Sequence, residues 1–599
     1  MDASQYSSRN GGLALHELLQ CLEEDDDNVP MDIYVQPPDD GKESGADSDL
    51  SDDEHEANLD HLPRNLLSAP CEVRKRLSED MDEDEYSSED DLSLSELRKK
   101  LLQDVTHTKS KKTKSKVTWQ KTLPTNCIKN AFLSEVSMSQ EVEDCKTPVD
   151  FFRLFFNDSL IELFVTETNR YALQKNKTLN VTKDEMFVFI GGMLLSGYAK
   201  YPNKRMYWSQ RIDVPRILSD AIRLHRFENI LTNFHLNDND AIDKNDRLYK
   251  LRPLLNHLNE SFKTHGSLEE NLSIDESMIP YYGKHYAKQY IKGKPIRFGF
   301  KNWALCASSG YMISFDVYTG KGTVNEYDFG LGGDVVIRLI KQAELPPSQG
   351  HKLFFDNYFT SVQLMLHLTQ EGFCATGTIR ESRTEKALLK DKKIMQKSKR
   401  GHYDFCTNDD KNILLIRWKD NQVVTLATNF DSARETTCTR WNKTKKAKES
   451  IVQPQAISSY NKSMGGVDLM DQMVAVYRTR MRQRKWWWPI FSYFLDVTVV
   501  NSWILMKKIF PNNEHSVNLL NFRRYLANCF LQNYGKPSSR GKIAPTPLED
   551  VRYDGKDHWP EYCVTDRRCR VCGKKSNFLC LKCNIGLHPK TCFKVYHVR

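Results

Sequence analysis

Four aspartates in this chain stand where they could bind metal ions. Asp468 and Asp471, in SMGGVDLMDQM, are three residues apart after a Gly-Gly pair, so on a helix their carboxylates would share a face. Asp275 in LSIDESM and Asp356 in LFFDNYF each follow an apolar, strand-like run. Converging carboxylates repel one another unless a cation lies between them, and Mg²⁺ prefers such oxygen ligands.

Two Mg²⁺ ions held by Asp275, Asp356 and Asp468 would suit in-line displacement at a phosphodiester, because one ion activates the nucleophile and the other stabilises the leaving oxygen. Wide separation in sequence is expected for ligands that come from different strands and a helix. Each aspartate taken alone is also explained as a helix cap or a turn residue. The pattern by itself leaves both interpretations open.

A second set of metal ligands lies near the C-terminus, in CRVCGKKSNFLCLKCNIGLHPKTCFKVYH. The start of the chain shows no secretory signal, so we expect reduced cysteines, and their spacing favours zinc over disulfides. The expected ligands are Cys569, Cys572, Cys580, Cys583, His588, Cys592 and His597. Two tetrahedral sites need eight, so His558 is the candidate for the eighth and Cys563 its competitor. The segment predicts a cross-brace module with two structural Zn²⁺ ions that supply its folding energy.

The surplus of Lys and Arg in this module suggests contact with DNA, with protein docking, for example of a histone tail, as the alternative. The charge of the whole chain is also uneven. Its net +7 combines a segment from Glu23 to Asp91, with 26 acidic and 5 basic residues, with a strongly basic remainder. Such a body attracts phosphates through counterion release, so we expect double-stranded DNA as a partner.

Residues 1–120 are expected to form a disordered acidic tail that ends in a basic stretch, because they contain too few apolar residues to fold. The stretch KSKKTKSK, residues 109–116, is typical of a nuclear import signal or of a phosphate-binding arm. Either interpretation predicts that the protein resides in the nucleus.

Two further basic groups are candidates for DNA binding. Arg478, Arg480, Arg482, Arg484 and Lys485 precede three tryptophans in YRTRMRQRKWWW. They could bind phosphates while an indole stacks on an unpaired base, although such tryptophans also anchor helices in a core. Lys292, Lys294 and Arg297 precede a predicted strand and could flank DNA, or could belong to a solvated strand end.

The segment from Trp486 to Met506 is long and apolar enough to tempt assignment as a membrane span. Asp496 and Asn501 lie inside it and Pro489 would interrupt it, so we predict a buried core helix and no membrane partner.

The elements that must position these residues follow from hydrophobic periodicity. Between about 148 and 265, apolar residues recur at spacings of three and four, which predicts amphipathic helices. From about 270 the pattern predicts a strand, a hairpin around Ser308-Ser309-Gly310, a helix and another strand. This order indicates a mixed α/β sheet with helices on its faces. Residues 381–450 look like an insertion with short strands.

Several segments in order resemble the piggyBac transposases and the proteins derived from them. They are TPVDFFRLFF, ETNRYALQKN, GYAKYPNKRMYW, DRLYKLRPLL, IDESMIPYYGKH, GKPIRFGFK, FFDNYFTSVQLM, ATGTIR and YNKSMGGVDLMDQM. The resemblance, from about residue 145 to the end, implies an RNase H-like catalytic core split by an insertion domain and flanked by an α-helical dimerisation and DNA-binding region. It also implies that Asp275, Asp356 and Asp468 form the catalytic triad, with Asp471 as a further aspartate one turn on.

The expected domains are the tail at 1–120, helical segments at 130–266 and 478–545, core segments at 267–380 and 451–477, the insertion at 381–450 and the zinc module at 553–599. The resemblance implies cut-and-paste transposition at TTAA sites through a hairpin intermediate, by a homodimer bound to terminal inverted repeats. Every chemical step would be an in-line displacement at phosphorus. The alternative is a catalytically idle, domesticated DNA-binding or chromatin protein.

Overall fold

The computed structural model describes residues 117–598, except 129–131, 133–137, 210, 212, 267, 284, 292–295, 321–325, 443–445, 512–516 and 537–548, and two earlier strands. The chain divides into two units, residues 1–113 and 114–599. In the first, β1 (Met31–Val35) pairs with β2 (Cys71–Lys75) in antiparallel register. The sequence analysis predicted a disordered tail there. That prediction rests on the average composition of the tail, in which the two five-residue strands are not apparent. The basic stretch at 109–116 lies outside the described residues.

The first half of the helical region follows the predicted periodicity. Its helices are α4 (Gln140–Glu143), α5 (Pro148–Arg153), α6 (Asp158–Gln174), α7 (Lys183–Ser196), α8 (Ile217–Ala221), α9 (Leu224–Asn233) and α10 (Arg252–His265), with 3₁₀ turns η2 (Lys204–Trp208) and η3 (Tyr249–Leu251). Capping boxes start α5 and α7, where Thr147 pairs with Asp150 and Thr182 with Glu185. These reciprocal bonds satisfy backbone N–H groups that a helix start leaves without partners.

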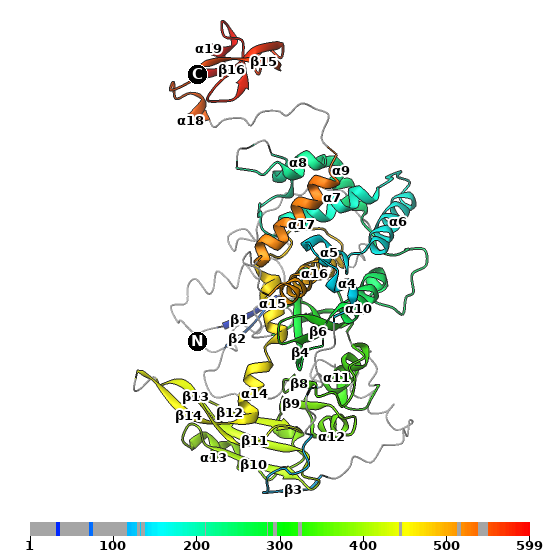
Figure 1. Ribbon diagram of the computed structural model, residues 1–599, viewed down its shortest axis with the longest axis vertical. Helices are drawn as coiled ribbons and strands as arrows, with labels where there is room; N and C mark the ends of the chain where they lie inside the picture. Colours follow the sequence, from blue (N-terminus) through cyan, green and yellow to red (C-terminus); the bar gives the residue numbers. More distant parts are fainter. Residues whose placement is uncertain are drawn as a thin grey trace. The chain divides into compact units, whose positions relative to one another are not determined.

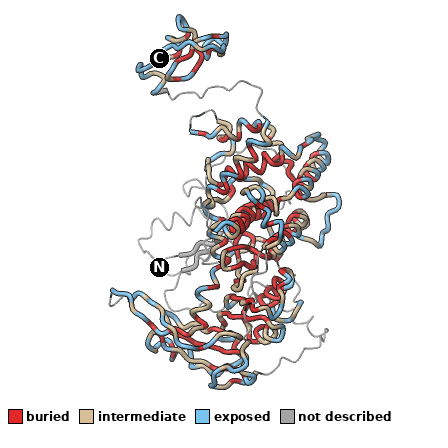
Figure 2. The backbone as a smooth tube through the Cα atoms, viewed as in Figure 1, coloured by how far each residue is buried: buried red, intermediate tan, exposed pale blue. Residues whose placement is uncertain are grey.

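The second half of the helical region comes from beyond the sheet. Helices α16 (Trp488–Ile509) and α17 (Leu519–Asn533) pack on α5, and α17 also runs beside α7 (Figure 1). Helix α16 is the apolar segment discussed above, and 83% of the most apolar part of this helix is buried inside the protein (Figure 2). The Asn501 side chain bonds both backbone groups of Met312, which fixes α16 against the sheet. The segment is a core helix, as predicted.

The sheet has ten strands and a mixed centre. Strands β4 (Asn271–Pro280), β6 (Phe298–Ala307) and β7 (Met312–Val317) form an antiparallel meander, and the β6–β7 turn contains Gly310, whose φ of +86° suits glycine. Strand β8 (Lys352–Phe355) runs parallel to β4, and β9 (Cys374–Thr378) runs parallel to β8. The short strand β5 (Lys288–Tyr290) pairs with the start of β6. Helices α11 (Gly330–Gln342) and α12 (Val362–Gln370) make the crossovers.

The insertion continues this sheet. Strands β10 (Tyr403–Asn408), β11 (Leu414–Lys419) and β12 (Val423–Thr428) are antiparallel neighbours, and β12 pairs with β9. Around them lie η4 (Glu381–Arg383), α13 (Lys392–Lys397) and the separate hairpin β13 (Glu435–Asn442) and β14 (Ala447–Pro454). The outermost strand, β3 (Trp119–Gln120), pairs with β10. The expected tail of 1–120 is therefore too long, because a two-residue strand is fixed by its distant partner.

The chain then returns to the centre of the sheet through α14 (Gln455–Ser463) and α15 (Gly466–Val476). The cysteine-rich end forms its own small fold from α18 (Glu549–Arg552), β15 (Pro560–Arg568), β16 (Lys575–Cys580), β17 (Ile585–Gly586) and α19 (Cys592–His597). Its buried cluster consists mainly of cysteines, with few apolar side chains. So small a core needs another source of stability.

Candidate active site and metal centres

Two of the candidate aspartates lie side by side where the parallel pairing of β4 and β8 ends. Ile274 on β4 is in register with Phe355 on β8, and Asp275 and Asp356 are the next residues of the two chains. Neighbouring strands are about 4.8 Å apart, so Asp275, within β4, and Asp356, directly after β8, lie close together in the fold. Both carboxylates are half-buried. The third strand, β9, brings Thr378 to the same level, because Gly377 is in register with Phe355.

Helix α15 delivers the third aspartate to this edge. At Gly466 a Cβ atom would lie 2.5 Å from the carbonyl oxygen of Ala307 and 2.6 Å from Oγ of Ser273, so only glycine allows the helix start to approach the sheet so closely. The next backbone N–H, of Val467, donates to the Ser273 hydroxyl at 3.2 Å. Asp468 follows in the first turn and is exposed. Gly466 is thus a packing requirement, whereas a Cβ atom at Gly465 would meet open space.

The phenol of Tyr460 on α14 lies near all three of these carboxylates. Burial first, and then the charges of Asp356, Asp275 and Asp468, raise its pKa, while a hydrogen bond with Thr378 opposes the rise. All three carboxylates of the predicted triad therefore act electrostatically on one phenol. In the described part of the chain, no three of the carboxylates place oxygen atoms within 4.8 Å of one another, so the site is wider than a cage for a single ion. Sequence analysis missed Tyr460, although it belongs to the YNKSMGGVDLMDQM segment.

Asp471 has a different environment from the other three. The Ser277 hydroxyl donates to its carboxylate at 2.6 Å, and that hydroxyl also lies 2.8 Å from the Tyr493 hydroxyl. Ser277 and Tyr493 are both buried. Asp471 thus joins α15 to β4 and α16 through hydrogen bonds, which is a positioning role that the spacing alone did not reveal.

The loop after Asp356 is held by an arginine from the insertion. The N–H of Tyr358 donates to the Asp356 carboxylate at 2.8 Å, which closes a tight turn. Arg383 on η4 donates to the backbone carbonyls of Asn357, Tyr358 and Thr360, at 3.2, 2.7 and 3.2 Å. Burial, followed by the neighbouring Arg380, lowers the pKa of Arg383. Its position three residues after ATGTIR carried no recognisable signal in the sequence.

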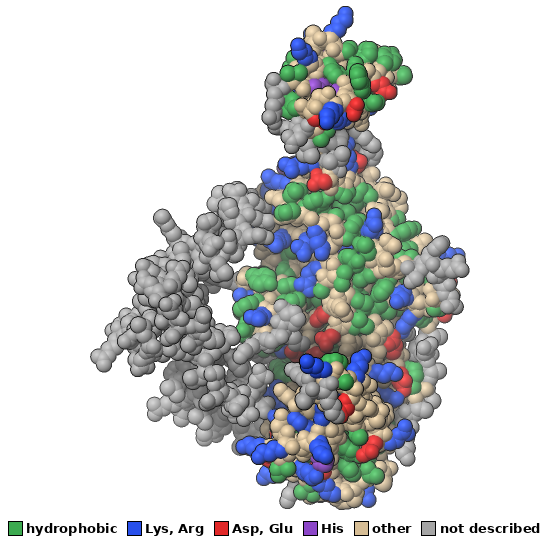
Figure 3. Space-filling view, turned by 90° about the vertical axis from the view of Figure 1, so that its left-hand side faces the viewer, with side chains coloured by type: hydrophobic (Ala, Val, Ile, Leu, Met, Phe, Trp, Pro, Cys, Tyr) green, Lys and Arg blue, Asp and Glu red, His purple; other side chains and the backbone are tan. Residues whose placement is uncertain are grey.

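The predicted DNA-binding residues occupy varied positions. Arg480, Arg482, Arg484 and Arg297 are exposed, Arg478 is half-buried, and Lys292 and Lys294 lie outside the described residues. Lysines and arginines are spread over the face in Figure 3. The Lys485 ammonium donates to the carbonyls of Thr232 and Phe234 at 2.8 and 2.7 Å, so it closes the end of α9.

The arginine-rich segment is anchored by a buried ion pair. Arg523 on α17 donates to Asp496 on α16 at 2.8 Å, and the two side chains are 2% and 1% exposed. Thr479 contributes its N–H and hydroxyl to the same carboxylate. Of the three tryptophans, Trp487 and Trp488 are buried in the core and Trp486 is half-buried. The anchoring interpretation therefore holds for the two buried tryptophans.

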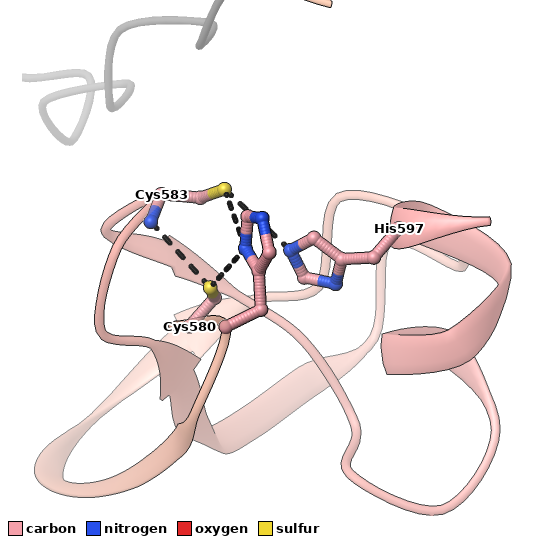
Figure 4. A group of neighbouring side chains, drawn as sticks. Cys580, Cys583 and His597 are labelled. Atoms are coloured by element: carbon pink, nitrogen blue, oxygen red, sulfur yellow. Dashed lines mark hydrogen bonds between the residues drawn. The ribbon is translucent and has the colours of Figure 1, made fainter. Parts of the chain in front are cut away.

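The cysteine-rich end gathers eight ligands into two groups of four. One group is His558, Cys580, Cys583 and His597, and the other is Cys569, Cys572, His588 and Cys592, with the ligand atoms of each within 4.8 Å of one another. The groups alternate along the chain, which is the predicted cross-brace. His558 is the eighth member, and Cys563 instead donates to the carbonyl of Thr565. Figure 4 shows Cys580, Cys583 and His597 pointing toward one another.

The surroundings of these groups fit a tetrahedral, thiolate-binding metal. Each histidine directs one ring nitrogen into its group and the other to an outer partner: His558 to Asp554, His588 to the carbonyl of Lys575, and His597 to that of Phe593. Such outer bonds fix the tautomer that a metal needs. Burial alone would raise the pKa of Cys569, but hydrogen bonds from three backbone N–H groups lower it to about 6. This favours the thiolate that zinc binds.

Comparisons with known proteins agree with this architecture. Residues 147–503 match the family model described as Transposase IS4. The chain is 35% identical to the human PiggyBac transposable element-derived protein 2 over 593 residues, which covers 98% of this chain and 96% of that one. The chain belongs to the piggyBac transposase family. Human PiggyBac transposable element-derived protein 3 is 34% identical, with 98% and 99% of the two chains covered.

A solved structure shares the fold of this family member. It is the piggyBac transposase in a synaptic complex with hairpin DNA, determined by cryo-electron microscopy. The similarity covers 76% of this chain and 99% of the piggyBac chain, with a TM-score of 0.57 at 20% identity.

Proposed function

We propose that this protein is a metal-dependent DNA transposase of the piggyBac type, which cuts and joins DNA at TTAA sites through a hairpin intermediate. One observation carries the proposal: Asp275 and Asp356 follow in-register residues of the parallel strands β4 and β8, and helix α15, which carries Asp468, starts against Ser273 of β4. Because the chain belongs to the transposase family, we assign these carboxylates to the cutting and joining of DNA. The strand order β7–β6–β4–β8–β9 supports an RNase H-like core.

The three carboxylates suit two Mg²⁺ ions, because hard divalent ions bind carboxylate oxygens. The ions would supply Lewis-acid activation of the nucleophile and the leaving oxygen. The chain contributes the positions of its carboxylates. Gly466 brings α15 against the sheet, and Arg383 holds the Asp356 loop through three backbone carbonyls.

DNA binding is assigned to the basic surfaces. The arginines at 480, 482 and 484, together with Arg297, are exposed and would contact phosphates. The zinc module, with one Zn²⁺ in each ligand group, would add contacts to the terminal repeats through its Lys and Arg side chains. A homodimer would bring two DNA ends together, and the basic stretch at 109–116 would direct the protein to the nucleus.

An excision assay with a TTAA-flanked reporter tests the proposal, using the terminal repeats found beside the gene. We expect Asp356→Asn and Asp468→Asn to lower excision by at least about a thousandfold while DNA binding is retained, since each loses a metal ligand. Asp410→Asn, at an exposed turn, is the matched control. Equal excision by all three variants would refute the metal site. Absence of excision by the wild type, with DNA binding intact, would favour the idle DNA-binding protein.

A further inference from the structure

Four large aromatic side chains are exposed between the end of β4 and the start of β6. Tyr282 is 80% exposed, Tyr286 60%, Tyr290 55% and Phe298 42%. Single exposed aromatic residues are common, but core packing does not explain four within 17 residues. We call these four residues the aromatic surface.

The aromatic surface rests on a second, buried layer of rings. Tyr290 and Phe298 face each other across the β5–β6 pair, with ring centroids 4.9 Å apart. The buried ring of Phe300 stacks on Tyr281 at 4.8 Å and meets His285 at 5.3 Å. Of these rings Phe300 is buried and Tyr281 and His285 are half-buried.

The same layer reaches the arginine-rich segment. His285 stacks on Trp486 with centroids 4.3 Å apart and an angle of 21° between the rings, and it contacts Tyr286 at 4.3 Å. Arg484 stands two residues before Trp486 and is exposed. The aromatic surface is thus continuous with one of the basic surfaces assigned to DNA.

Cations border the aromatic surface directly. The Arg247 guanidinium lies 5.1 Å from the Tyr286 ring centroid, and the Lys288 ammonium lies 5.8 Å from that of Phe298. Arg297, next to Phe298, is exposed. The sequence of residues 281–297 contains five Lys or Arg and no Asp or Glu. Rings with a cationic border complement a polyanion whose aromatic faces are open.

We propose that the aromatic surface binds an unpaired stretch of a DNA strand, with bases stacked on its rings and phosphates against Arg247, Lys288 and Arg297. The inference rests on the proposed function in taking DNA as the substrate. In a duplex the faces of the bases are already stacked, so this surface selects single strands. Asp275 lies five residues before the end of β4, roughly 17 Å along this β-strand. A DNA strand bound to the aromatic surface is therefore within reach of the carboxylates.

Fluorescence anisotropy with a labelled oligodeoxythymidine and with a duplex of equal length tests the inference. The double variant Tyr286→Ala and Tyr290→Ala removes two rings, whereas Tyr286→Phe and Tyr290→Phe keeps them. We expect the alanine pair to weaken single-strand binding at least about tenfold, because each stacked base contributes measurably. Duplex binding should change less than twofold, and the phenylalanine pair should bind as the wild type does.

Binding is measured without cleavage, so an inactive wild type in the excision assay leaves this test intact. Thermal unfolding establishes that both double variants are folded, and a triple variant with Phe298→Ala extends the series if the pair is ambiguous. Equal losses on single strands and duplex would overturn the inference in favour of a general charge effect. A change in oligomeric state by light scattering, with single-strand affinity unaltered, would overturn it in favour of self-association.

Discussion

The carboxylate site and the cysteine-histidine module both contain candidate metal ligands, but they are built in opposite ways. The module takes all eight ligands from 40 consecutive residues, and its core is made largely of the ligands themselves. The carboxylate site takes Asp275, Asp356 and Asp468 from two strands and a helix separated by 193 residues, inside a large apolar core. The fold of the module would therefore depend on bound metal. The carboxylates, in contrast, are positioned by the packing of the core.

Zinc removal should produce the largest effect, and only in the module. Cys580→Ser should lower the zinc content below about two ions per chain and unfold residues 549–598, because metal binding supplies on the order of 10 kcal/mol of folding free energy. Cys563→Ser is the matched control, since Cys563 belongs to neither group. Metal analysis and limited proteolysis are the measurements. If the module stayed protease-resistant without zinc, its folding would not depend on metal, and the stated difference from the carboxylate site would be wrong.

The body should instead depend on buried contacts far from its carboxylates. Arg523→Met leaves Asp496 buried without its cation, which should lower the free energy of unfolding by about 3–5 kcal/mol in a denaturant titration. The double variant Asp496→Leu with Arg523→Met should recover most of that loss. A double variant as unstable as the single one would show that packing, not the uncompensated charge, is responsible.

A buried histidine of the body should make the free energy of unfolding depend on pH. Burial lowers the pKa of His235, in the body, to about 4, although a hydrogen bond to Asn239 opposes this. Between pH 6.5 and 4 the unfolded chain binds a proton that the folded chain does not, so the free energy of unfolding falls as the pH falls, by no more than roughly 3 kcal/mol. His235→Gln should flatten this dependence in chemical unfolding, and exposed His225→Gln should leave it unchanged.

The smallest effect should come from loosening one support of the carboxylate site. Arg383→Lys keeps the charge but cannot reach three carbonyls, so we expect cleavage to fall about 10- to 100-fold through misplacement of Asp356. Arg380→Lys is the comparison, because the Arg380 guanidinium donates to the side chain of Asn357. Single-turnover kinetics would measure both. Equal losses would assign the effect to charge near the site.

The module was largely predictable from the sequence. Its ligand types and spacings indicated two sites, and the count of seven led to His558 as the eighth ligand. The helices between 148 and 265, the β6–β7 hairpin and the core helix α16 were equally accessible, since each depends on residues that are neighbours in sequence. The aspartates were recognised as candidates, but their proximity could only be expected from the family resemblance.

What remained hidden depends on pairing between distant segments. Strand β3 forms because Trp119 and Gln120 meet β10, almost 290 residues later, and the insertion joins the sheet because β12 meets β9. Tyr460, Arg383 and Ser277 acquire their roles only where such pairings bring them to the carboxylates. No local pattern marks them.

The sequence by itself determined which residues could bind metal and which segments become helices or strands, because ligand chemistry and backbone periodicity act over a few residues. Only the tertiary structure decided that Asp275 and Asp356 follow in-register residues of β4 and β8, that α15 starts against β4, and that four aromatic rings remain exposed. The physical reason is that strand register and helix docking are set by side-chain packing across the whole core, where each contact depends on many others.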